Sequence, residues 1–139
     1  MGQAVNVLRV THSEQLANLR SLVAEALATS PLVTDAAAAI IELAGKLNDP
    51  DLGLFVCDGG MLLIECRRGF LSPGCTVVHV YCPKGGRKEL LAAGTTLAKE
   101  RGCTRWFGVD INKRGEAYER LIKPDREIGM MYEGNIDER

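Results

Sequence analysis

The stretch that decides the fold is TVVHVYCPKGGRKELLAAG, residues 76–94. Apart from His79, its first seven residues are apolar or β-branched, which is typical of a strand, and from about Gly86 onward the leucines and alanines have helical spacing. Gly85 and Gly86 join the two segments. A glycine turn before a helix is a common way to hold a phosphate, because the first N–H groups of a helix lack partners within it. The alternative is a turn that needs glycine only for its backbone conformation.

The bulk composition predicts one globular domain over residues 1–139. Hydrophobic residues make up 46% of the 139 residues and charged residues 25%, with a formal net charge of −1. This balance gives no overall field for nucleic acid or an anionic membrane surface. No apolar run is long enough to span a bilayer, and the N-terminus lacks the pattern of a secretion signal, so we expect a cytoplasmic protein.

The cysteines predict reduced thiols in a core. There are five of them, an odd number, scattered along the chain with no CxxC pair. Metal ligands usually come in closely spaced pairs, so this pattern does not favour zinc.

Hydrophobic periodicity predicts an α+β fold in the order β-α-α-β-β-β-α-β-α-β. The helices are expected at 11–29, 35–47, 86–101 and 114–122, the first with a capping box of Thr11 and Glu14, and the second capped by Thr34 or Asp35. The strands are expected at 5–10, 52–57, 61–66, 76–82, 104–111 and 126–136, the last as one strand or two. Asp58-Gly59-Gly60 is a tight-hairpin signal. We therefore expect a mixed, mostly antiparallel central sheet of six or seven strands with about four helices.

This order, and four local sequences, resemble the GNAT superfamily of N-acetyltransferases. DLGLFVCDGGMLLIEC (51–66) looks like the family's second and third strands, and VVHVYCPKGGRKELLAAGTTLAKERGC (77–103) looks like its fourth strand, pyrophosphate loop and following helix. INKRGEAYERLI (111–122) is similar to the stretch in which an Asn precedes a helix with a tyrosine, and IGMMYEG (128–134) resembles the closing strand.

The resemblance implies an acetyl-coenzyme A site between the fourth and fifth strands. The family places the pantetheine against the backbone of the fourth strand and the pyrophosphate on the loop that follows. Carried over to this sequence, the implied coenzyme-binding residues are Val80, Tyr81, Cys82, Lys84, Gly85, Gly86, Arg87, Lys88 and Asn112. The implied activity is acetyl transfer to a small amine or a protein amino group, and the family builds its acceptor pocket from the first two helices and the hairpins.

The loop departs from the family pattern at two positions. Cys82 stands where the family has Arg or Gln, and Arg87 stands at the second glycine position. Gly85 fits the first glycine position, and we expect Gly86 to be incidental. A guanidinium at residue 87 could fold outward and pair with a phosphate, or it could block the approach of the phosphates to the backbone.

Aminolysis of a thioester requires a base for the amine proton and an acid for the departing thiolate. Tyr118 falls where the family often keeps the acid, although it also lies on the apolar face of a short helix and could be a core residue. His79 is a candidate base, and it shares one strand face with Tyr81 because side chains alternate along a strand. Glu65 on the neighbouring strand is a weaker candidate. The alternatives are a hydrogen-bonded strand histidine and a solvent-facing glutamate.

A second hypothesis is a GNAT-fold protein that has lost catalysis. It rests on Cys82 and Arg87 in the loop, and on a looser resemblance to the GNAT-like internal virion proteins of short-tailed phages, which also carry basic residues in place of glycines. In that case the partners would be proteins of an assembly and the location a virion. A Cys-His-Asp hydrolase lacks a supporting local signature.

Overall fold

The computed structural model describes residues 6–30, 33–68 and 73–108. In chain order its elements are β1 (Leu8–Arg9), α1 (Ser13–Asn18), α2 (Arg20–Ala28), α3 (Ala36–Lys46), β2 (Leu52–Cys57), β3 (Gly60–Arg68), β4 (Pro73–Tyr81), α4 (Arg87–Glu100) and β5 (Arg105–Gly108).

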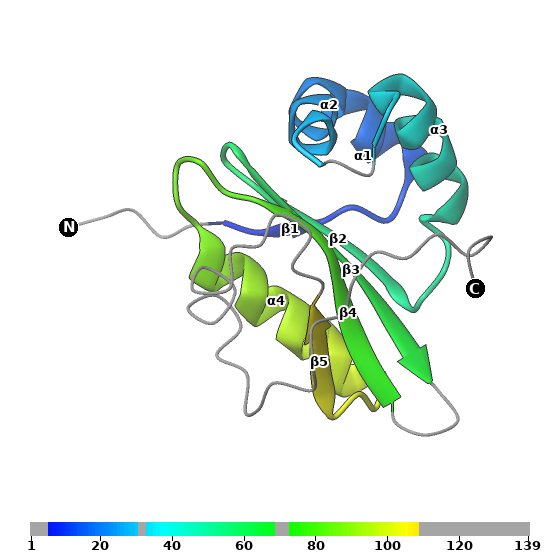
Figure 1. Cartoon of the computed structure of the whole chain (residues 1–139), viewed down its shortest axis with the longest axis vertical. Helices are drawn as coiled ribbons and strands as arrows, with labels where there is room; N and C mark the ends of the chain where they lie inside the picture. Colours follow the sequence, from blue (N-terminus) through cyan, green and yellow to red (C-terminus); the bar gives the residue numbers. More distant parts are fainter. Residues whose placement is uncertain (1–5, 31–32, 69–72, 109–139) are drawn as a thin grey trace, which may run out of the picture.

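The strands form one five-stranded sheet in the order β1-β2-β3-β4-β5. Every neighbouring pair is antiparallel except β4 and β5, which run parallel. The helices α1, α2 and α3 cover one face of this sheet, and α4 covers the other (Figure 1). A parallel pair requires a crossover connection, and α4 supplies it.

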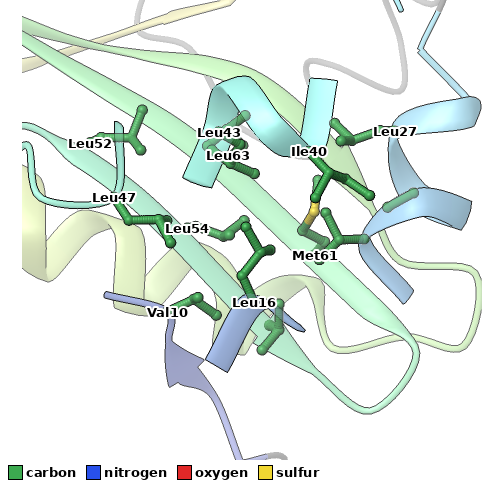
Figure 2. Close-up of a cluster of buried hydrophobic side chains, with 13 residues drawn as sticks. Val10, Leu16, Leu27, Ile40, Leu43, Leu47, Leu52, Leu54, Met61 and Leu63 are labelled. Atoms are coloured by element: carbon green, nitrogen blue, oxygen red, sulfur yellow. The ribbon is translucent and has the colours of Figure 1, made fainter. Parts of the chain in front are cut away.

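Alternation along the strands divides the core into two clusters, one on each face. On the face of α1–α3, Leu54, Met61 and Leu63 pack against helix residues such as Leu16 and Ile40 (Figure 2). On the other face, strand residues pack against Leu90 and Leu97 of α4. Burying each such leucine contributes about 1.5–3 kcal/mol, which fixes β2 and β3 as the rigid centre of the sheet.

A β-bulge interrupts the pairing of β3 with β4. Leu63 lies opposite His79, whereas Ile64 lies opposite Val77, so Val78 is the extra residue. Val77 therefore belongs to the α4 cluster, while His79 and Tyr81 turn toward the helices α1–α3. The expected shared face of His79 and Tyr81 is confirmed.

Most of the predicted elements within the described residues are confirmed, and local signals set their ends. Asp35 caps α3, since its side chain accepts a hydrogen bond from the Ala38 N–H at 3.2 Å. Gly59 in the β2–β3 turn has φ 71°, and Gly102 after α4 has φ 77°. These are the left-handed conformations for which glycine is suited.

Two features of the first helical region differ from the prediction. The expected single helix is divided at Leu19, which has φ −108° and ψ 12° and ends α1 one residue before α2 begins. The residue that reaches back to the chain before α1 is Gln15, not Glu14. The Gln15 Oε1 accepts from the N–H groups of Thr11 at 2.9 Å and His12 at 3.1 Å. The helix begins two residues after Thr11, so Gln15 occupies the position that faces these donors.

The described residues contain five of the predicted six or seven strands. The remaining predicted strand region, at 126–136, and the helix at 114–122 lie outside them. Among the described residues, no helix is both long enough and apolar enough to cross a membrane.

Candidate active site

The connection from β4 to α4 is a glycine turn with a left-handed backbone. Gly85 has φ 95° and Gly86 has φ 92°. Gly86 is the N-cap of α4, and its carbonyl accepts the first helical hydrogen bond, from the Leu90 N–H at 2.9 Å. The expectation that Gly86 is incidental is therefore wrong, because an L side chain is strained at this φ.

The N-terminus of α4 has no side-chain cap among the described residues. In this respect the 14-residue helix differs from α3, which Asp35 caps. The N–H groups of Arg87, Lys88 and Glu89 precede the first helical hydrogen bond and have no partner within the helix. Together with the helix dipole, such N–H groups favour an anion.

Three positively charged side chains lie at or just before the N-terminus of α4. Lys84, Arg87 and Lys88 are all exposed, and the Lys84 side chain lies beside Gly59 in the β2–β3 turn. Glu89 is the one acidic residue in the first turn of α4. The loop residues predicted to bind the coenzyme are thus brought together, with a positive excess that suits a phosphate.

Arg87 reaches back to the end of β4. Burial raises the pKa of the Cys82 thiol, and the hydrogen-bonded Arg87 guanidinium opposes that rise. Cys82 is 8% exposed, so its thiol lies beneath the loop rather than at its surface. Arg87 therefore influences Cys82 at the start of the loop, while its own side chain remains exposed.

The β4 strand pairs with β5 on the edge opposite β3. Within the described residues this parallel pairing runs from Gly74 with Arg105 to Val77 with Gly108, which is the last described residue. On its other edge β4 pairs with β3 as far as Tyr81, just before the connection to α4 that contains the glycine turn.

The His79 side chain is hydrogen-bonded to the C-terminal end of α2. Its Nε2 lies 2.7 Å from the Ala26 carbonyl oxygen and 3.0 Å from Thr29 Oγ1. A carbonyl oxygen only accepts, so Nε2 carries the proton, and in the neutral ring Nδ1 is left as an acceptor. Burial lowers the pKa of His79, which favours this neutral form. The predicted hydrogen-bonded strand histidine is present, in a tautomer that can still take a proton.

Tyr81 and Glu65 have polar partners on the same face of the sheet. The Tyr81 hydroxyl donates to Glu25 of α2 at 2.8 Å, and this hydrogen bond raises the pKa of Tyr81. Glu65 lies opposite Thr76, on the other side of the bulge from His79, and pairs with Arg67 at 2.8 Å. The structure thus brings His79 and Tyr81 together and engages the Glu65 carboxylate elsewhere.

The structure adds two residues that sequence reasoning missed. Glu25 and Thr29 lie one helical turn apart on α2 and contact Tyr81 and His79, respectively. Their four-residue spacing is the one sequence signal that could have linked them. Tyr118 and Asn112 lie outside the described residues, so their predicted roles remain predictions.

All five cysteines are buried and unbridged, as predicted. Cys66 and Cys75 lie opposite each other on β3 and β4 with their sulfur atoms 3.8 Å apart. Burial raises the pKa of Cys66 to about 11 and raises that of Cys75 further. Thiols with such pKa values react slowly, so this pair is part of the core rather than of the site.

Comparison with solved structures identifies the architecture. No protein-family model matches the chain, and none of the curated protein sequences matches it either. Solved structures match over almost the whole chain. The aminoglycoside N-acetyltransferase AAC(6')-Iy, solved with CoA, is 15% identical with a TM-score of 0.72, and the match covers 98% of this chain and 97% of that one. The chain has the GNAT fold.

Two further acetyltransferases with known organisms support this assignment. The aminoglycoside 6'-N-acetyltransferase AAC(6')-IG from Acinetobacter haemolyticus has a TM-score of 0.69 at 16% identity, covering 94% of this chain and 97% of its own. A ribosomal-protein-alanine N-acetyltransferase from Brucella melitensis biovar Abortus 2308 has a TM-score of 0.67 at 17% identity, covering 96% and 100%. At such identities the likeness shows the GNAT fold and leaves the acceptor undefined. The looser resemblance to phage virion proteins gains no support from these structures.

Proposed function

We propose that this protein transfers the acetyl group of acetyl-coenzyme A to an amine. The observation that carries the proposal is the β4–α4 loop, in which a left-handed Gly85-Gly86 turn leads into an uncapped helix N-terminus beside three exposed cations. This loop connects β4 to α4 in a GNAT fold shared with solved acetyltransferases.

The described residues fit the coenzyme. The N–H groups of Arg87 and Lys88 would face an anion bound at the helix end, and the guanidinium of Arg87 would add donors in a geometry that suits a phosphate. Lys84 adds a further positive charge. The β4 edge at Val80 and Tyr81 would lie along the pantetheine, and Asn112 completes the proposed set. When bound, the coenzyme supplies an activated thioester carbonyl.

His79 is the proposed base. Its Nδ1 would accept the proton that the amine loses as the new N–C bond forms, while Nε2 stays fixed on the Ala26 carbonyl at 2.7 Å. A neutral imidazole is required for this role, and burial favours it. Glu65 is a second candidate base, weakened by its ion pair with Arg67. Tyr118 is the proposed donor of a proton to the sulfur when the C–S bond breaks.

The proposal is tested with the purified protein, acetyl-coenzyme A and a panel of amines. A ligand that binds only the native state stabilises it and so raises the melting temperature. At a ligand concentration one hundred times the Kd, the stabilisation is about 2.7 kcal/mol. We expect such a shift, and we expect His79→Gln to lower kcat by about 10²-fold or more. His12→Gln, at the exposed second histidine, is the matched control. The absence of both a shift at millimolar coenzyme and any transfer would refute the proposal in favour of a non-catalytic GNAT-fold protein.

A further inference from the structure

The helix α3 is apolar on all sides but buried on only one. Apart from Glu42 and Lys46, its residues are alanine, isoleucine, leucine and glycine. A helix that is apolar all round is normally buried all round. Ile40 and Leu43 do pack into the core cluster on the sheet (Figure 2), whereas Ile41 is 72% exposed. The side of α3 that points away from the sheet therefore lacks a covering partner among the described residues.

This outer face of α3 consists of Ala37, Ala38, Ile41 and Gly45, all of them exposed. In the described part of the chain three large hydrophobic side chains are exposed, and that of Ile41 is the most exposed of them. A Cβ added at Gly45 would meet nothing within 4 Å. Packing against the described residues thus gives no reason for a glycine that weakens the helix interior. A glycine there does allow another backbone to approach closely.

The outer face is complementary to itself when a second copy lies antiparallel to it. The helix runs from Ala36 to Lys46, so Ile41 is its midpoint, and Ala37 and Gly45 lie four residues to either side. A two-fold axis beside Ile41 would bring the two Ile41 side chains together and place each Ala37 against the Gly45 of the other copy. Two-fold symmetry is the commonest symmetry of soluble homo-oligomers.

The charges at the two ends of α3 are also complementary in this arrangement. Asp35, at the N-terminal end, is exposed, and none of the ion pairs among the described residues involves it. Lys46, at the C-terminal end, is exposed and pairs with Glu42 of its own helix at 3.1 Å. In an antiparallel pair, Lys46 of each copy would lie near Asp35 of the other. The two helix dipoles would then oppose each other, which is the favourable orientation.

We propose that the outer face of α3 binds a second copy of this chain, in a two-fold symmetric dimer with antiparallel α3 helices. An 11-residue helix is about 16 Å long, so α3 alone buries less than the roughly 1,200–2,000 Å² of a standard interface. The dimer is therefore expected to be weak and to depend on protein concentration. None of the candidate site residues lies on α3, so the dimer does not depend on the proposed acetyl transfer.

Sedimentation of the full chain, from micromolar to millimolar concentration, measures the Kd of the dimer. Ile41→Glu would place like charges together at the two-fold axis and should raise this Kd at least about 10-fold. Ile41→Ala should raise it less, because it removes only apolar contact area. Leu8→Glu, at an exposed leucine of β1, is the matched control and should leave the Kd unchanged.

Asp35→Asn and Lys46→Gln test the antiparallel orientation. Asparagine caps a helix about as well as aspartate, so Asp35→Asn removes the charge and keeps the cap. Either substitution removes the same two pairs between copies and should raise the Kd about 5-fold. Within one copy the two residues lie about 16 Å apart along the helix, beyond the Debye length of about 8 Å at physiological salt. The double variant should therefore bind no more weakly than either single variant, and additive losses would overturn the arrangement.

Three outcomes would contradict a second copy as the partner. A dimer that Ile41→Glu leaves intact would place the interface elsewhere. A wild-type chain that stays monomeric at millimolar concentration would also overturn the proposal, and the melting temperature of Ile41→Glu then distinguishes two cases. A marked decrease would show that residues of the same chain cover the outer face. An unchanged melting temperature would show that the face is free for a different protein.

Discussion

The Arg87 side chain is expected to determine how well the β4–α4 loop binds a phosphate. The Arg87→Ala variant tests this role. The residue stands at a position where the GNAT pattern has glycine, and its guanidinium opposes the rise that burial causes in the pKa of the Cys82 thiol. Arg87 is the first residue of α4, and its side chain is exposed. We therefore expect the side chain to be a phosphate ligand, and its removal to weaken coenzyme binding.

The expected loss of coenzyme affinity in Arg87→Ala follows from the exposure of the Arg87 side chain. A hydrogen bond to a charged group contributes about 1.5–3 kcal/mol when it is shielded, whereas exposed ion pairs contribute about 0.2–1 kcal/mol. Arg87 is exposed, so we take the upper end of the second range. About 1 kcal/mol corresponds to roughly a 5-fold increase in Kd. Arg87→Lys keeps the charge and loses the planar guanidinium, so its Kd should lie between those of the wild type and of Arg87→Ala.

The assay is calorimetric titration of coenzyme A at two ionic strengths. We expect Arg87→Ala to raise Kd about 5-fold and to reduce the loss of affinity at high salt, because one screened charge has been removed. Lys99→Ala, in the last turn of the same helix, is the control for net charge. Tighter binding by Arg87→Ala would mean that the side chain obstructs the site, and an unchanged Kd would mean that it plays no part.

Three further outcomes are expected. Gly86→Ala places a side chain at φ 92° and should destabilise the fold by about 1–2 kcal/mol in thermal or chemical unfolding; unchanged stability would contradict the left-handed turn. Because burial lowers the pKa of His79, the unfolded state binds its proton more readily. The free energy of unfolding should therefore have its full value above about pH 6.5 and decrease as the pH falls below that value. The decrease should be smaller in His79→Gln than in wild type. The thiols, Cys66 and Cys75 above all, should react with a disulfide reagent only after denaturation, and rapid native labelling would argue against their burial.

The elements that the sequence predicts well are those whose signals are local. Asp35 is followed at once by the alanines of α3 and caps it, and Asp58-Gly59-Gly60 makes the β2–β3 turn where a tight hairpin was expected. A short polar side chain or a glycine needs only its nearest neighbours to produce these structures, so the residues themselves are sufficient evidence.

The features that escape prediction depend on partners far along the chain. Leu19 interrupts a helical pattern whose spacing continues unbroken, because α1 and α2 each turn leucines into the same cluster on the sheet. Glu25 contacts Tyr81 across 56 positions of sequence, and Thr29 contacts His79 across 50. No local pattern carries such pairings, so these contacts become visible only once α2 lies on β4.

The bulge at Val78 sets the direction of the candidate base. With strict alternation, Val77 and His79 would share a face, and the imidazole would enter the buried cluster beneath α4. The extra residue reverses the phase, so His79 meets the Ala26 carbonyl while Val80 and Cys82 pack on the α4 side. A single inserted residue thus separates the candidate base from the α4 cluster and turns it toward α2.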